Sequence, residues 1–161
     1  MNKVISIAFL ILLSLIFIIL QSTLFSPRNL GIFRPDLNLI WIIFLSLFSG
    51  VRGSAIIALG NGYMMDVLSG HMFGIYTLSR ISVFAILKGF SMNVYSQSRV
   101  MQGIAIFFGT IFAWSFIWAV LEIKSNLEFS VSFVGVLVQS VVNTTVGIPL
   151  FWVIKRLYAQ I

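Results

Sequence analysis

The stretch Gly60–Gly74, with the sequence GNGYMMDVLSGHMFG, places polar residues inside a long apolar region. It contains an aspartate, Asp66, and the only histidine of the chain, His71. A few residues later, Arg80 lies within the next apolar run. Because carboxylates and guanidiniums are costly to place in hydrocarbon, such residues indicate a functional or structural centre. We expect the rest of the chain to be a scaffold that holds this stretch at one edge of a membrane.

The composition around this stretch indicates an integral membrane protein. The 161 residues are 60% hydrophobic and 9% charged, with a mean hydropathy of +1.09, whereas soluble domains are about 25% charged. The net charge of +6 comes from basic residues scattered at the ends of apolar segments. That pattern is typical of the positive-inside rule and excludes a nucleic-acid-binding patch. The absence of cysteine excludes disulfides and thiolate metal sites.

Apolar runs and turn residues predict an all-α bundle of six transmembrane helices in one domain, residues 1–161. If the second and third segments form one broken hairpin, the count is five. The first segment has no A-x-A cleavage site, so we expect it to remain as a span. Pro35 and Asp36 suit the first turn of the second helix. The predicted helices are Val4–Phe25, Leu37–Phe48 with a start near Pro35, Ser54–Leu68, Met72–Phe90, Val100–Leu121 and Ser130–Ile154.

The distribution of basic residues predicts the orientation. With six spans and both termini cytoplasmic, one basic residue, Arg80, is intramembrane. The inner side then carries Lys3, Arg52, Lys88, Arg99, Lys155 and Arg156, and the outer side carries Arg28, Arg34 and Lys124. Because the cytoplasmic side is the more basic one, this model is favoured over its inverse.

Small and polar residues recur every four positions in two of the predicted helices. In the third helix these are Ser54, Ala58, Gly62 and Asp66, and in the sixth they are Gly135, Gln139, Asn143 and Gly147. Residues at this spacing share one helical face. Small residues let membrane helices approach closely, and amides must face the bundle interior to find partners.

Two interpretations of the polar residues remain open. Asp66 and Arg80 are predicted to lie about 6–8 Å apart along the helix axes. They form either an ion pair that locks a helical hairpin or a polar centre that a partner or ligand engages. Likewise, Gln139 and the run Asn143–Thr145 either line a small-molecule cavity or make interhelical hydrogen bonds.

The sequence contains no catalytic, metal or cofactor motif. It has no G-x-S-x-G, no H-E-x-x-H and no paired glutamates. The glycines Gly60 and Gly62 are not followed by the Lys-Ser/Thr of a phosphate loop, and His71 has no second ligand at metal spacing. We expect no enzyme activity and no bound cofactor or metal.

Several short motifs, taken in order, resemble the MreD family of rod shape-determining membrane proteins. The family shows a P-D-L opening to its second helix, a G-x-x-x-D element that ends a small-residue helix, and a glycine after a short gap. The matching residues are Pro35, Asp36, Leu37, Gly62, Asp66 and Gly74. The chain departs from the family where Tyr63–Met65 replaces a frequent Gly-Leu pair. Length, span count and cytoplasmic termini agree over the whole chain.

The resemblance implies a non-enzymatic component of the bacterial elongation machinery in the cytoplasmic membrane. Such proteins act with MreC, the expected direct partner, and with the actin-like MreB. Through them they act with a SEDS glycosyltransferase and a class B penicillin-binding transpeptidase. The partner helix is expected along the small-residue stripe of the third and fourth helices, which contains Ala58 and Gly62. With Pro35, Asp36, Asp66, Gly74 and Arg80 these residues form a polar centre whose role is either partner binding or structural.

The alternative is a substrate-binding membrane component of a vitamin-type transporter. The family is similar in fold to the substrate-binding components of energy-coupling-factor transporters. On that hypothesis a ligand binds near Gln139 and Asn143.

Overall fold

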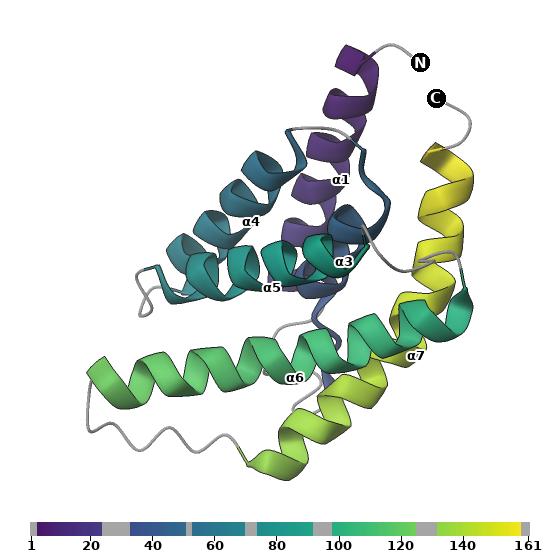
Figure 1. Cartoon of the computed structure of the whole chain (residues 1–161). Coiled ribbons are helices and arrows are strands. Elements are labelled where there is room, and N and C mark those ends of the chain that lie inside the picture. The colour runs from purple at the N-terminus through teal and green to yellow at the C-terminus, as the bar shows by residue number, and fades with distance from the viewer. Residues whose placement is uncertain are drawn as a thin grey trace.

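The computed structural model, which describes residues 3–23, 33–50, 53–69, 74–91, 98–124 and 132–158, contains six α-helices and no strand in those ranges (Figure 1). The helices are α1 (Lys3–Thr23), α3 (Leu37–Phe48), α4 (Ser54–Ser69), α5 (Ile75–Ser91), α6 (Arg99–Lys124) and α7 (Phe133–Tyr158). The predicted all-α architecture is confirmed, and every predicted helix is present with small shifts at its ends.

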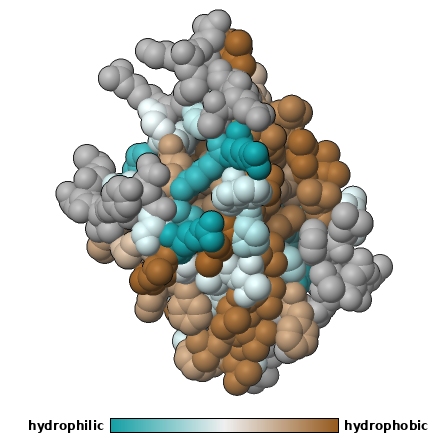
Figure 2. All heavy atoms as spheres, turned by 90° about the vertical axis from the view of Figure 1, so that its right-hand side faces the viewer, coloured by the Kyte–Doolittle hydropathy of each residue, from teal (hydrophilic) through white to brown (hydrophobic). Residues whose placement is uncertain are grey.

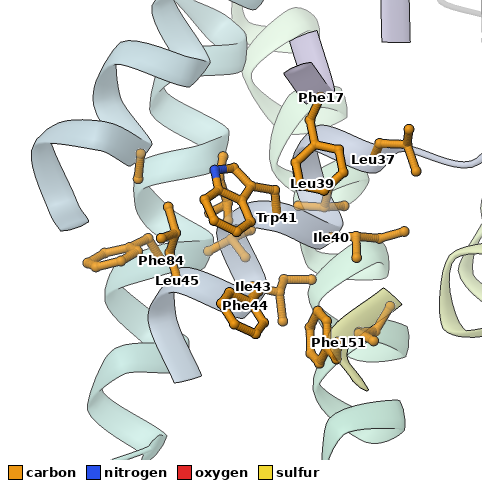
Figure 3. Packing of buried hydrophobic residues seen from close by; sticks show 14 of the residues in the cluster. Phe17, Leu37, Leu39, Ile40, Trp41, Ile43, Phe44, Leu45, Phe84 and Phe151 are labelled. Carbon is orange, nitrogen blue, oxygen red and sulfur yellow. The ribbon is translucent and has the colours of Figure 1, made fainter. Parts of the chain in front are cut away.

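The short helix α3 lies at the centre of the bundle and contacts each of the other five helices. All its residues from Leu37 to Ser46 are buried, as expected for a helix that is apolar on every side. Trp41 stacks on Phe44 with ring centroids 5.5 Å apart and lies 5.4 Å from the ring of Phe17 on α1. Phe44 also meets Phe151 of α7 edge-on at 5.3 Å (Figure 3). These contacts make α3 the core of the molecule.

The helix α1 buries only one of its faces. Its buried stripe is Ser6, Leu10, Ser14, Phe17 and Gln21, which are 1–6% exposed. The opposite face leaves large aliphatic side chains uncovered, among them Val4, Leu12 and Ile19. A helix with one packed face and one apolar exposed face suits the periphery of a membrane bundle, where lipid covers the outer side.

Three helices, α1, α6 and α7, are long and apolar enough to cross a membrane. The apolar helix α3 has 12 residues and is therefore about 18 Å long, less than the roughly 30 Å of a hydrocarbon core. It is short because Asp36 starts it inside the bundle. The six helices are confirmed, whereas six complete spans remain a prediction.

The first and last helices bring the two ends of the described chain to the same side of the bundle (Figure 1). The rings of Phe9 on α1 and Tyr158 on α7 are 6.2 Å apart. This agrees with an even number of crossings. The cytoplasmic location of that side remains a prediction.

The helices α4 and α5 form a close-packed hairpin around Gly62. A Cβ atom at Gly62 would lie 2.7 Å from the Cα of Thr77 on α5, a distance that side chains do not adopt. In contrast, Gly60, two residues earlier, has open space in the direction of a Cβ atom. At the start of α5, Gly74 has φ +81°, a left-handed conformation that glycine adopts without strain. The hairpin therefore depends on Gly62 for its spacing and on Gly74 for its turn.

We predict that Gly62→Ala destabilises the protein, because the added methyl group meets the α5 backbone and must push the helices apart. Overpacking of this kind costs about 1–3 kcal/mol. The matched control Gly60→Ala should be neutral or stabilising by up to about 1 kcal/mol, because alanine favours helix and nothing lies in its way. Unfolding in detergent micelles measures both changes. Equal stabilities of the two variants would contradict the packing.

Candidate functional site at the start of α3

The segment from Arg34 to Asn38 begins α3 inside the bundle and is the polar centre of the molecule. Asp36 is the N-cap, and its Oδ1 accepts a hydrogen bond of 2.9 Å from the backbone N–H of Leu39. Pro35 precedes the cap and is buried. The helix thus begins two residues after the predicted start near Pro35, because the aspartate side chain serves as the cap.

Two neighbouring helices supply acceptors for backbone donors at this helix start. The N–H of Leu37 donates to Oε1 of Gln21 on α1 at 2.9 Å. The N–H of Asp36 donates to Oδ1 of Asn143 on α7 at 2.8 Å. A helix start has N–H groups without intrahelical partners, and in an apolar surrounding each must be satisfied by protein. Gln21 and Asn143 therefore join α1 and α7 to α3.

The charge of Asp36 is balanced by Arg80 of α5. The guanidinium Nη2 donates to Oδ2 of Asp36, and the two residues form a buried ion pair. Arg80 is 1% exposed and Asp36 is 5% exposed. The aromatic ring of Tyr76, one turn earlier on α5, lies 5.8 Å from the guanidinium carbon. The hypothesised pair between Asp66 and Arg80 is wrong, because the α3 start brings Asp36 to the arginine.

Asp66, the last residue of the small-residue stripe, instead caps α5 from the neighbouring helix. Its Oδ1 accepts from the N–H of Tyr76 and its Oδ2 from the N–H of Thr77, both at 2.9 Å. The hydroxyl of Thr77 also donates to Oδ2. The carboxylate is thus stabilised by the positive end of the α5 dipole and by backbone donors of its first turn. No arginine is required.

A second group of amides links α4 and α1 to α3 next to this site. Nδ2 of Asn61 donates to the Oγ of Ser14 at 3.0 Å and to Oδ1 of Asn38 at 3.5 Å. Nδ2 of Asn38 lies 2.8 Å from the sulfur of Met65. These buried side chains hold three helices together through polar contacts.

The polar stripe predicted on the last helix faces the interior from Gln139 to Gly147. Gln139 donates to the carbonyl of Arg34 at 3.2 Å, and Nδ2 of Asn143 donates to Thr110 of α6 at 3.1 Å. A Cβ at Gly147 would lie 2.7 Å from Ile106 of α6, so this glycine allows α6 and α7 to approach. Gly135 differs, because it is only half-buried and has open space around it.

The structure brings together Pro35, Asp36, Arg80, Gln139 and Asn143 at the start of α3. It places Asp66 at the start of α5. Ala58 and Gly62 are buried in the bundle, and Gly62 lies against the backbone of α5, so a partner helix could reach Gly62 only by displacing α5. Of the two roles considered for this stripe, the contacts are those of a structural one.

Several residues of the site were missed by the sequence analysis. They are Gln21, Asn38, Asn61 and Thr110, and the signal that could have found the first three is an amide within an apolar run.

The site can bind helices but offers little for chemistry. Its carboxylates, Asp36 and Asp66, are each occupied by an arginine or by helix N–H groups. No group of three His, Cys, Asp or Glu side chains that could hold a metal ion occurs among the described residues. His71 lies outside those residues.

A double-mutant cycle tests which aspartate Arg80 depends on. Asp36→Asn should cost about 3–5 kcal/mol of stability, because it leaves the guanidinium buried without its counter-charge. Adding Arg80→Met should then cost much less than it does in the unmodified protein. The same cycle with Asp66→Asn should be close to additive. Unfolding in detergent measures the unmodified protein and the five variants, and a coupling larger with Asp66 than with Asp36 would contradict the observed pair.

Comparison with known proteins identifies a family for the chain. The family model described as rod shape-determining protein MreD matches residues 1–161, the whole chain. No curated protein and no solved structure matches the chain. The similarity in fold to energy-coupling-factor components therefore stays a prediction. Since the match covers every residue, the chain belongs to the MreD family of rod shape-determining proteins.

Proposed function

We propose that this protein is a non-enzymatic membrane scaffold of the cell-elongation machinery, which helps to organise lateral peptidoglycan synthesis. Membership of the rod shape-determining family carries the general role. The observation that supports a scaffold is the buried ion pair between Asp36 and Arg80. These charged side chains join α3 to α5. The whole chain, residues 1–161, acts as one helical unit in this proposal.

The proposed partners follow from the family. MreC is the direct partner, and MreB, a SEDS glycosyltransferase and a class B penicillin-binding transpeptidase act in the same complex. Because Ala58 and Gly62 are packed inside the bundle, the partner helix is expected to contact outward-facing side chains of the hairpin, such as Tyr63 and Val67, which are 60% and 59% exposed.

The proposed location is the bacterial cytoplasmic membrane, crossed several times. Three helices are long and apolar enough to span it. The described residues Lys88 and Lys155 both contact the end of α3. Arg156 follows Lys155 in the last turn of α7, a helix that ends on the side of the chain ends (Figure 1). This gathering of basic residues supports a cytoplasmic location of that side.

The transporter alternative receives no comparable support. It requires Gln139 and Asn143 to be available to a ligand. Both amides are already engaged, Gln139 with the backbone of Arg34 and Asn143 with Asp36 and Thr110. Interhelical hydrogen bonding accounts for these side chains.

Depletion of the protein in its own host should convert rods to rounded cells, because lateral wall synthesis loses its membrane organiser. Re-expression of the unmodified chain should restore the rods, and so should the Gly60→Ala variant, whose added methyl group meets nothing. Asp36→Ala should fail, because it removes both a helix cap and a buried counter-charge. Microscopy of cell length and width measures shape, and co-purification measures MreC binding. Persistence of normal rods after depletion would refute the proposal.

A further inference from the structure

An apolar groove runs between α5 and α6 on the outside of the bundle. Two adjoining hollows of about 400 and 380 Å³ share Leu87, Phe90 and Phe108, and so form one continuous groove. Almost all the lining side chains are apolar. Along α6 the lining extends from Met101 to Ser115, a length of about 21 Å at 1.5 Å per residue.

The size of the groove favours a single hydrocarbon chain over a helix. One leaflet contributes about 15 Å of a bilayer core that is roughly 30 Å thick. The groove is therefore long enough for an acyl chain of that leaflet. A transmembrane helix is about 10–12 Å across with its side chains and occupies far more volume than the hollows provide. Each hollow lies within the roughly 300–1,000 Å³ that is usual for small-molecule sites.

Basic residues gather near one end of the groove. The lining includes Leu47 near the end of α3, and two lysines gather at that same helix end. Nζ of Lys88 donates to the carbonyl of Ser49 at 2.8 Å, and Nζ of Lys155 lies 3.7 Å from the ring centroid of Phe48. Arg99, two residues before the first lining residue of α6, is exposed.

The described carboxylates lie at the opposite ends of the same helices. Asp36 caps the start of α3, Asp66 of α4 accepts from the first-turn N–H groups of α5, and Glu122 lies near the end of α6. Figure 2, which shows the right-hand side of Figure 1, displays hydrophilic residues gathered next to hydrophobic surface. The groove mouth therefore faces a cationic rim without a described acid beside it, which is complementary to an anionic headgroup.

We propose that this groove binds an anionic phospholipid, with one acyl chain between α5 and α6 and the phosphate at the rim formed by Arg99, Lys88 and Lys155. The lipid fills a gap between two helices, and its headgroup neutralises cations gathered at the end of α3. This binding site is independent of the scaffold function and involves none of the polar contacts at the start of α3.

Native mass spectrometry of the full chain in mild detergent tests the proposal with an equal mixture of phosphatidylglycerol and phosphatidylcholine. The unmodified protein should retain phosphatidylglycerol about fivefold better than phosphatidylcholine. A factor of this size corresponds to roughly one contact between a basic side chain and an anionic lipid. Arg99→Glu should remove that preference. The control Arg156→Glu, which makes the same charge change at a guanidinium stacked on Trp152, should keep it. Equal retention of both lipids, or equal effects of the two variants, would overturn the proposal.

A second measurement locates the acyl chain. Ala105→Phe places a bulky ring in the groove and should abolish retention of both lipids, while Ile56→Phe, at a position 73% exposed on α4, should not. Melting of each variant checks that it is folded. A phosphatidylglycerol with a photoreactive acyl chain should label peptides of α5 and α6 in the unmodified protein, so that the assignment does not rest on a variant. Labelling spread evenly over α1 and α4 would indicate only annular lipid and would overturn the proposal.

Discussion

The start of α3 inside the bundle is the constraint on which the rest of the structure depends. Exposed backbone donors in an apolar medium cost several kilocalories per mole each. The N–H groups of Asp36 and Leu37 find acceptors on α7 and α1, and the capping carboxylate is neutralised from α5. Satisfying one helix end thus fixes the relative positions of four helices. The apolar contacts of α3, centred on Trp41 and Phe44, then fill the interior.

Two aspartates solve the same physical problem in different ways. Asp36 caps its own helix, where its side chain accepts one backbone N–H. Its negative charge is balanced by a buried guanidinium. Asp66 caps a different helix and receives two backbone N–H groups and a hydroxyl. Both charged groups therefore serve the packing of helices.

The distribution of polar contacts leaves the outer surface for interaction. The interior amides of Asn38, Gln139 and Asn143 are engaged, whereas the exposed faces of α1, α4 and α6 carry large apolar side chains. In a membrane, helices associate through packing and hydrogen bonds and gain little from leaving lipid. A partner helix and a bound phospholipid are thus expected to recognise the shape of these faces, with charge selecting the headgroup at one side.

The sequence by itself determined the class, the six helices and the inward faces of α4 and α7, because apolar run length and four-residue spacing are local properties of the chain. It also indicated that Asp66 and Arg80 are costly residues that must be satisfied. Only the tertiary structure decided which groups satisfy them. Asp36 and Arg80 are 44 positions apart, and their meeting depends on how α3 and α5 cross, which no local pattern encodes. The same reason explains why Gly62 packs inside the bundle, where a partner helix was expected.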